Sequence, residues 1–262
     1  MSLPDTVKQC CARLYESDVA RLLLGDSFHP GGTRLTERLG ELLGLGAQSR
    51  VLDIASGTGT SALFLAERFG CEVVGVDYGS HNVEQSNAAA TARGLDKRVS
   101  FRIGDAERLP FPDASFDAVI CECAFCTFPD KTAAAAEFAR VLRSGGDVGL
   151  SDLTSGPILP KELSGLLAWV ACIADAQPVD NYVRYLCDAG FCVERVEPHD
   201  EALWELVNQV RTKLLSAEIL VGLKKLELPG VDFTAVKEMA RSALSAVREG
   251  SLGYAIFHAG KP

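Results

Sequence analysis

Carboxylates and thiols that could carry out chemistry follow three short apolar runs. Asp53 opens the glycine-rich turn Asp53-Ile-Ala-Ser-Gly-Thr-Gly59, and Asp77 lies 77 − 57 = 20 residues beyond Gly57. The segment Cys121-Glu-Cys-Ala-Phe-Cys126 places three thiols around one carboxylate. A glycine turn lets the backbone approach a ligand, an acid at that distance can bind a ribose diol, and thiolates bind soft ions. The residues therefore indicate an adenosine pocket beside a cluster of thiols.

Short β-branched strands that alternate with amphipathic helices must position these groups. The predicted strands are 50–54, 72–77, 99–104, 116–122, 147–153, 191–196 and 254–258. The predicted helices are 60–69, 82–93, 131–142, 160–174, 181–189 and a broken helical insertion over 200–248. This pattern is typical of an α/β fold with a doubly wound, seven-stranded and mostly parallel sheet, whose connections are right-handed crossovers. Ligands of such sheets bind beyond the carboxyl ends of the strands.

The domain organisation follows from what is missing between these elements. The chain shows no internal repeat, no Gly/Ser/Pro-rich linker and no charge block, which indicates a single domain over 1–262. Within it we expect a helical lid at 1–48, a cofactor-binding core at 49–154, and acceptor-side helices and last strands at 155–262.

Charge and hydropathy exclude several classes of partner. The chain has 26 Lys and Arg against 35 Asp and Glu, a formal charge of −9, which argues against nucleic acid and against a basic membrane-surface patch. No signal peptide is evident, and the most apolar later stretch, 166–174, is far shorter than the ~20 residues of a membrane helix. We expect a cytoplasmic protein without membrane insertion, whose nine cysteines are thiols and whose partner is a small molecule. The oligomeric state stays open.

The order and spacing of the motifs over 50–153 resemble those of class I S-adenosylmethionine-dependent methyltransferases. The segments that carry the resemblance are the glycine turn, Asp77 and the stretches 104–111, 116–119 and 140–146. The resemblance implies a Rossmann-like fold and S-adenosylmethionine as the cofactor. The glycine turn departs from the G-x-G-x-x-G spacing, so a dinucleotide site loses its main support.

The resemblance also implies roles for individual residues. Asp77 is expected to hold the ribose hydroxyls, Tyr78 to pack on adenine, and Asp105 to meet the adenine edge. The segment from His29 to Gly32 resembles the lid that precedes the sheet, where His29 is either a turn residue or an active-site residue. The residues expected to bind the cofactor are Asp53, Ala55, Ser56, Gly57, Gly59, Asp77, Tyr78, Asp105, Ala106, Cys121 and Gly32.

The cysteines point to the methyl acceptor. Cys121 and Cys123 are two apart on a strand and should share one face, with Glu122 on the other. Cys126 follows in the loop that should lie over the methyl donor. The segment around Cys172 resembles arsenite methyltransferases, in which a cysteine at this place is a metalloid ligand.

That second resemblance is incomplete. The first metalloid cysteine of the arsenite methyltransferases corresponds to Ala62, and their last one has no counterpart near Ser251. A rebuilt site would use Cys123, Cys126 and Cys172 as ligands of a thiophilic substrate, with no resident metal.

The leading hypothesis is a small-molecule methyltransferase whose acceptor is a metal(loid) such as arsenite, with Cys123, Cys126, Cys172 and Glu122 as catalytic residues. The alternative is an organic acceptor of the quinone, sterol or thiol type, for which Glu122 or His199 could act as general base. A hypothesis of another class is a non-catalytic sensor of the cofactor or of a soft metal.

Overall fold

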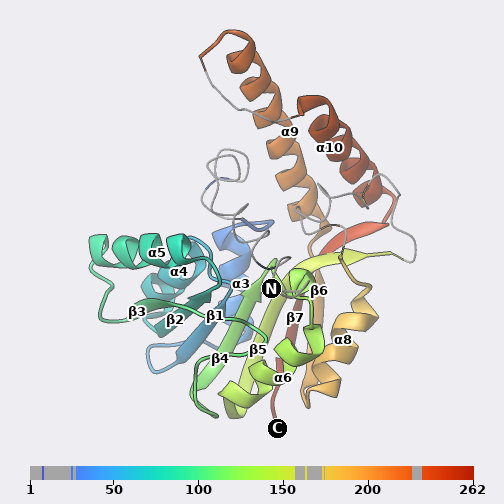
Figure 1. Ribbon diagram of the computed structural model, residues 1–262. Coiled ribbons are helices and arrows are strands. Elements are labelled where there is room, and N and C mark those ends of the chain that lie inside the picture. The colour runs from blue at the N-terminus through green and yellow to red at the C-terminus, as the bar shows by residue number, and fades with distance from the viewer. Residues whose placement is uncertain are drawn as a thin grey trace.

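A seven-stranded sheet forms the centre of the computed structural model, which describes residues 8, 25, 28–156, 163, 173, 175–225 and 232–262. The strand order is β3-β2-β1-β4-β5-β7-β6 (Figure 1). The strands are β1 (Arg50–Ile54), β2 (Glu72–Asp77), β3 (Val99–Ile103), β4 (Phe116–Glu122), β5 (Leu142–Ser155), β6 (Cys192–Pro198) and β7 (Leu252–Gly260). Only β7 runs antiparallel to its neighbours in this part of the chain. The predicted seven-stranded, mostly parallel α/β sheet is confirmed.

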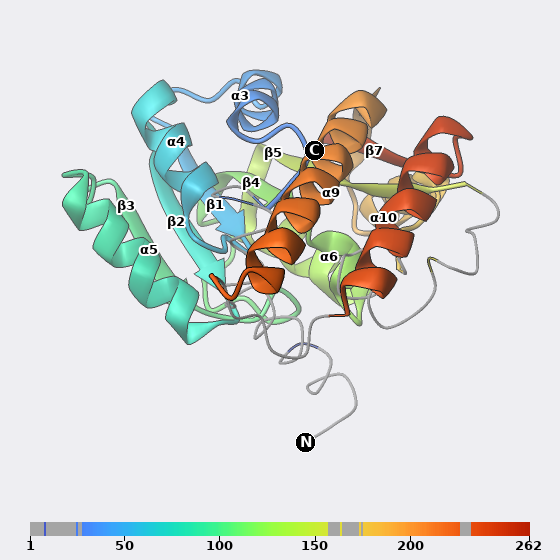
Figure 2. The same cartoon turned by 90° about the horizontal axis from the view of Figure 1, so that it is seen from above.

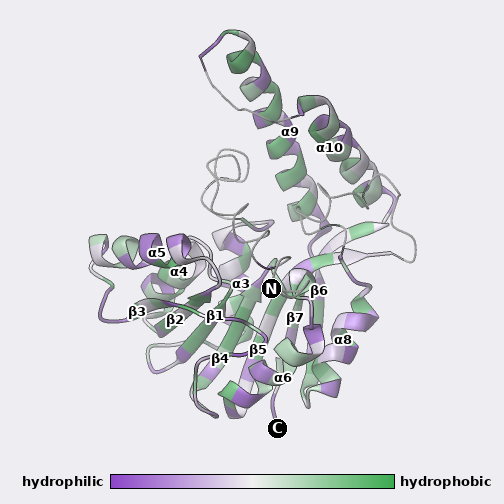
Figure 3. Cartoon of the chain, in the orientation of Figure 1, coloured by the Kyte–Doolittle hydropathy of each residue, from purple (hydrophilic) through white to green (hydrophobic). Residues whose placement is uncertain are grey.

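Helices cover both faces of the sheet and make a three-layer arrangement (Figure 2). Apolar residues of α3 (Thr33–Leu42), α4 (Thr60–Phe69) and α5 (Ser80–Ala92) share one core cluster with residues of the strands. Those of α6 (Lys131–Val141) and α8 (Val179–Asp188) belong to a second cluster. Because both faces are covered, the central strands are mostly apolar, as their largely green colour in Figure 3 shows. Asp53 is a buried acid inside one of them, β1.

Two further helices form an arm that stands out from the carboxyl edge of the sheet (Figure 1). They are α9 (Asp200–Gly222) and α10 (Phe233–Arg248), and they pack along each other. Asp232 caps α10 because its carboxylate accepts hydrogen bonds from the N–H groups of Thr234 and Ala235, both at 3.0 Å. The arm is inserted between β6 and β7, which are direct neighbours in the sheet.

Two predictions from the sequence need correction, and a third concerns residues that the structure does not describe. The connections are not all crossovers between parallel strands, because β7 lies antiparallel between β5 and β6. β5 starts at Leu142 rather than 147, since the pairing with β4 shifts register between Phe116 and Ala118 and lets residues 143–146 bulge out. The helix expected at 160–174 lies outside the described residues. Among the helices that the structure describes, none is long and apolar enough to cross a bilayer.

Candidate active site

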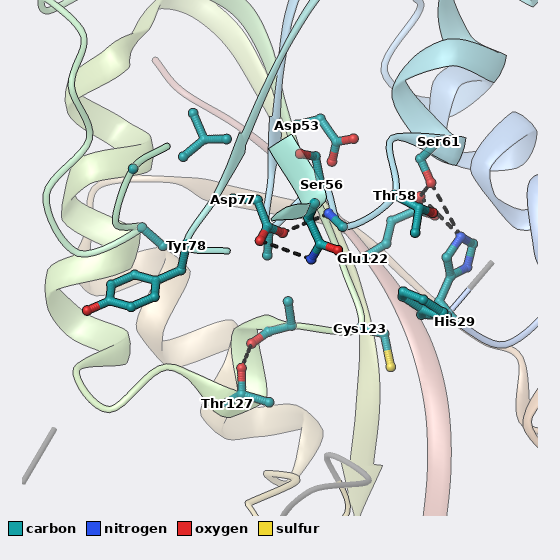
Figure 4. Close-up of a pocket in the computed structure, with 18 of the residues that line it drawn as sticks. His29, Asp53, Ser56, Thr58, Ser61, Asp77, Tyr78, Glu122, Cys123 and Thr127 are labelled. Atoms are coloured by element: carbon teal, nitrogen blue, oxygen red, sulfur yellow. Dashed lines mark hydrogen bonds and ion pairs between the residues drawn. The ribbon is translucent and has the colours of Figure 1, made fainter. Parts of the chain in front are cut away.

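A cavity opens at the carboxyl ends of β1, β2 and β4, beside the turn that follows β3 (Figure 4). These are the strands whose ends carry the acids singled out in the sequence. Of the expected cofactor residues, those that line the cavity are Asp53, Ala55, Ser56, Gly57, Asp77, Tyr78, Asp105 and Ala106. Gly59, Gly32 and Cys121 are not among its lining residues. The topology thus brings together side chains that are up to about fifty residues apart in the chain.

The glycine turn after β1 lines one wall of the cavity. Gly57 has φ 52°, in the left-handed region that glycine adopts without strain, and a Cβ there would lie 3.6 Å from the Phe28 ring, in ordinary van der Waals contact. Gly59 has φ 77°, and a Cβ there would lie 2.6 Å from the Phe101 ring. Gly57 therefore shapes the cavity, whereas Gly59 lets α4 begin close to the sheet.

Asp77 fixes this turn from the end of β2. Its Oδ2 accepts a hydrogen bond from the N–H of Gly57 at 2.8 Å, and its Oδ1 accepts one from Gly79 at 2.8 Å. The amide of Asn82, in the first turn of α5, also donates to Oδ1 at 3.3 Å. The carboxylate consequently joins two loops and keeps one face toward the cavity (Figure 4). Asn82 was missed by sequence reasoning, although its place one helical turn after Asp77 was the available signal.

Several polar atoms of the cavity wall are shielded from solvent and have no hydrogen-bond partner in the protein. They are Asp53 Oδ2, Ser56 Oγ and Asn82 Oδ1. Burial raises the pKa of Asp53 well above its ordinary value, and the negative charges of Glu122 and Asp77 add to this rise. Such acceptors suit a ligand that brings hydroxyl and ammonium donors, because an unsatisfied buried polar atom costs about 1–3 kcal/mol.

The side chains at the β3 end of the cavity are more exposed than those at the β4 end. Tyr78 is 36 % exposed there, beside Ala106 and Asp105. Lys8 reaches this end from the N-terminal segment, and its Nζ lies 2.8 Å from Asp105 Oδ2 and 2.5 Å from Glu107 Oε2. These side chains offer an aromatic face and a carboxylate, as an adenine ring requires. Sequence reasoning had no signal for Lys8, which is 97 residues from its partner Asp105.

The β4 end carries a buried polar cluster. Glu122 accepts hydrogen bonds from Ser61 Oγ at 2.5 Å and from Thr36 Oγ1 at 3.1 Å. His29 Nε2 lies 3.5 Å from Glu122 Oε2 and 3.4 Å from the hydroxyls of both Ser61 and Thr36. Only 7 % of the His29 side chain and 4 % of the Glu122 side chain are exposed. This end of the cavity can therefore accept and hold a proton.

The expectation that Cys121 and Cys123 share a face is wrong. Cys121 is fully buried in the core cluster that contains α6 and α8 residues, whereas Cys123 packs against the opposite cluster and lines the cavity. The reason is that β4 ends at Glu122, and Cys123 adopts φ 54°, so the alternation of the strand stops there. Glu122 and Cys123, expected to point apart, both line the cavity.

The remaining cysteines of the hypothesis do not reach the cavity or cannot be placed. Cys126 is fully buried in the turn η1 (Phe125–Thr127), where its N–H donates to Asp152 Oδ2 at 2.8 Å. Burial raises the pKa of the Cys121 thiol well above its ordinary value, which opposes a thiolate. Cys172 lies outside the described residues. Within the described ranges, no three His, Cys, Asp or Glu side chains are arranged to hold a metal ion.

The two other candidates lie near the site or outside it. Gly32 precedes α3 as its N-cap residue, and its N–H donates to the carbonyl of His29 at 3.3 Å, so it shapes the turn before α3 rather than the cavity wall. His199 precedes α9, with Nε2 3.6 Å from Glu197, and does not line the cavity. Further lining residues that sequence reasoning missed are Phe28, Thr58, Thr60, Ser61, Thr127 and Phe128.

Comparison with known proteins shows the family to which the chain belongs. The family model described as "Methyltransferase domain" matches residues 51–146. The 27-O-demethylrifamycin SV methyltransferase of Amycolatopsis mediterranei is 30% identical over 94% of this chain and 94% of its own length. An arsenite methyltransferase of Halobacterium salinarum is 30% identical over 64% of this chain and 45% of its own. The solved phosphoethanolamine N-methyltransferase 2 of Haemonchus contortus, in complex with S-adenosyl-L-methionine, has a TM-score of 0.80 at 20% identity, and the match covers 100% of this chain and 60% of that one.

Fold, cavity and relatives together define a class I methyltransferase. The chain belongs to the S-adenosylmethionine-dependent methyltransferase family and is an enzyme that acts on a small molecule. S-adenosylmethionine is its methyl donor, as the motif resemblance implied, and the orphaned acceptors of the cavity wall fit the donor's hydroxyl and ammonium groups. The hypothesis of a non-catalytic sensor is set aside in favour of an enzyme.

Proposed function

We propose that this protein transfers a methyl group to a hydroxyl oxygen of an organic small molecule. The observation that carries the proposal is the buried cluster at the β4 end of the cavity, where Glu122 and His29 lie 3.5 Å apart. A hydroxyl must lose its proton as the new bond to carbon forms, so an oxygen acceptor needs a proton acceptor beside it. Arsenic(III) carries its own lone pair and needs thiolates instead.

The relatives support the same choice. The 27-O-demethylrifamycin SV methyltransferase matches 94% of this chain, and its name describes a substrate that lacks an O-methyl group. The arsenite methyltransferase matches over a smaller part of both chains. Of the described cysteines in the segment 121–126, only Cys123 lines the cavity. An oxygen acceptor therefore accounts for more of the site than a metalloid does.

The strand order supports one direction for the bound donor. In the proposed arrangement Asp77 holds the ribose hydroxyls over β2, and the adenine lies over the end of β3 against Tyr78 and Ala106. The methionine part then extends toward β1 and β4, where Asp53 Oδ2 is free to receive its ammonium group. Figure 4 shows Tyr78 and His29 at opposite ends of the cavity, so His29 lies toward the methyl end.

The bound donor supplies an electrophilic methyl group on a sulfonium, and the protein supplies placement and proton handling. The glycine turn and Asp77 set the position of the donor, while Phe28 and His29 line the wall on the lid side of the cavity. Holding the two reactants in line converts a bimolecular step into an effectively unimolecular one. Glu122, with Ser61 and Thr36 bonded to it, keeps the acceptor end polar.

The experiment is a donor-consumption assay against matched acceptor panels. Purified protein is incubated with S-adenosylmethionine and with phenols, polyketide-type alcohols, catechols, thiols or arsenite, and S-adenosylhomocysteine and the methylated product are quantified. The proposal expects O-methylated product from at least one hydroxyl acceptor and no methylated arsenic. Methylation of arsenite with no turnover of any hydroxyl acceptor would refute it.

A second candidate, arsenite methylation, keeps one specific observation in its favour. The Cys123 side chain lines the cavity beside Glu122, where a soft substrate bound by Cys123 and Cys172 would meet the methyl group. Cys123→Ser and Cys172→Ser variants in the same assay separate the two functions. Arsenite methylation in the wild type that both substitutions abolish would establish this candidate.

A further inference from the structure

The polar cluster at the β4 end contains a histidine whose orientation is fixed from both sides. His29 Nδ1 lies 3.2 Å from the carbonyl oxygen of Pro30. A carbonyl oxygen only accepts hydrogen bonds, so Nδ1 is the nitrogen that carries a proton. In this tautomer Nε2 keeps its lone pair, on the side of the ring that faces Ser61, Thr36 and Glu122. Ser61 and Glu122 line the cavity together with His29, so Nε2 lies at the cavity wall.

The groups around Nε2 leave that lone pair available. The Ser61 hydroxyl lies 2.5 Å from Glu122 Oε2 and 3.4 Å from Nε2, and the Thr36 hydroxyl lies 3.1 Å from the same carboxylate oxygen and 3.4 Å from Nε2. Both hydroxyls therefore make their shorter contacts with the carboxylate. Glu122, satisfied by two hydroxyls and only 3.5 Å from Nε2, is placed to stabilise a positive charge on the imidazole.

From this geometry we infer that His29, in the lid, is the catalytic base that takes the acceptor's proton at Nε2, and that Glu122 is the positioning residue that stabilises the resulting imidazolium. The inference rests on the proposed hydroxyl acceptor and deepens it. The sequence alone left two interpretations of His29, a turn residue or an active-site residue. The inference assigns it to the active site.

The step balances without a further reactant. The O–H bond of the acceptor breaks, and its proton passes to His29 Nε2. The oxygen's electron pair forms the new O–CH3 bond, and the electron pair of the broken C–S bond stays on sulfur, which leaves neutral S-adenosylhomocysteine. The imidazolium then returns its proton to solvent.

The backbone of the lid explains why His29 reaches the site. His29, Pro30, Gly31 and Gly32 form a turn that precedes α3, closed by the hydrogen bond from Gly32 N–H to the His29 carbonyl. Gly31 has φ 76°, and a Cβ there would lie 2.4 Å from Leu35 Cγ. The turn thus needs glycine to pack onto α3, and this packing carries the imidazole over the end of β4.

The test compares His29→Gln with His81→Gln, a control at an exposed histidine on α5 that does not line the cavity. We expect His29→Gln to lower kcat with an alcohol acceptor about 10²–10⁴-fold, the contribution of a general base, while donor affinity changes less than about threefold. With 4-nitrophenol, which is already ionised at pH 8, the loss should shrink to below about tenfold. Added imidazole should restore part of the activity of His29→Ala but not that of His29→Gln.

A second readout does not depend on the acceptor. The chain has four histidines, so nitrogen NMR of ¹⁵N-histidine protein with S-adenosylhomocysteine assigns His29 by the signal lost in His29→Gln. We expect the Nδ1–H tautomer for it. Equal activity of His29→Gln and wild type on hydroxyl acceptors, a loss of donor affinity that matches the loss of rate, or the Nε2–H tautomer would overturn the base assignment. A wild type that methylates no hydroxyl acceptor refutes the proposed function itself, and the base assignment with it.

Discussion

Replacing Asp53 by Asn should make the donor-free protein more stable at neutral pH and the donor complex weaker. The Asp53 side chain is 2 % exposed, it receives a hydrogen bond from the N–H of Ala62, and its Oδ2 has no partner in the protein. Burial is the main cause of the raised pKa of Asp53, and the charges of Glu122 and Asp77 act in the same direction. An amide of the same shape removes this buried acid.

The sign of the pH dependence follows from proton counting. Between the ordinary pKa of 3.8 and the raised pKa of the folded protein, the native state binds more protons at Asp53 than the unfolded state does. The free energy of unfolding therefore falls as pH rises through that window. Asp53→Asn lacks this slope, so the two proteins should be similar near pH 4 and should diverge as pH rises.

The magnitude can be set from the cost of burying the carboxylate, because an amide stays neutral at every pH of the assay. A buried polar group without a partner costs about 1–3 kcal/mol, and more when it is charged, so we expect a gain of about 1–3 kcal/mol at neutral pH. A domain of this size gains roughly 2–4 °C in Tm for each kcal/mol. In the complex, loss of a charge-assisted hydrogen bond to the donor's ammonium group should cost about 1.5–3 kcal/mol, roughly a ten- to hundredfold weaker affinity. Stability and affinity should therefore move in opposite directions.

The assay is thermal unfolding of both proteins from pH 5 to pH 9 without donor, followed by calorimetric titration with S-adenosylmethionine at pH 7.5. Asp96→Asn, at an exposed turn before β3, is the matched control and should change neither quantity. Parallel Tm curves for wild type and Asp53→Asn would refute the argument that Asp53 is a strained buried acid. Unchanged donor affinity would remove it from the donor site.

Three further outcomes are expected from other parts of the molecule. Asp77→Asn should weaken donor binding by at least about 2 kcal/mol, roughly thirtyfold, because three donors converge on that carboxylate, and calorimetry with unchanged affinity would contradict this. Cys123→Ser should keep hydroxyl methylation within about threefold, because a packing thiol takes no part in the transfer; a hundredfold loss in turnover would speak for a thiol ligand. Arg38→Met should cost about 0.5–1 kcal/mol at pH 7, because Arg38 is the main cause that lowers the pKa of Glu197 from 4.5 to about 2, and both side chains are partly exposed. That stability is present above pH 4.5 and is lost as pH falls toward 2, so urea unfolding at pH 7 and pH 3 checks it, and an equal effect at both would exclude the ion pair as its cause.

The central strands could be predicted because their physical signal is local. β1, β2 and β4 were expected at the residues where they occur, since continuous apolar runs between turn residues are typical of strands covered on both faces. The place of β7 was not predictable in the same way. A buried strand has the same apolar pattern in either direction, so its antiparallel insertion between β5 and β6 depends on contacts far apart in sequence.

The residues of the candidate site also differ in whether a local sequence signal could predict them. Ala55 and Ser56 follow β1 and Asp77 is the last residue of β2, so the sheet topology alone brings them to one edge. The orientation of Cys123 depends on a single left-handed residue after β4, which no periodicity reveals. His29 reaches Glu122 only because the turn over residues 29–32 packs on α3. The sequence, a single histidine before a proline, does not predict this contact.

The arm of α9 and α10 leaves the sheet and returns to it at nearly the same point. The N–H of His199, just before α9, donates to the carbonyl of Tyr254 at 2.6 Å, and the N–H of Tyr254 donates to Asp200 Oδ1 at 2.9 Å. The ends of this long excursion are thus held together by β6 and β7 themselves. Because the entropy of closing a loop grows only slowly with its length, the arm can be lengthened, shortened or exchanged at small thermodynamic cost. Such changes leave the glycine turn and its acids untouched, so evolution can alter this region while methyl-donor binding is inherited intact.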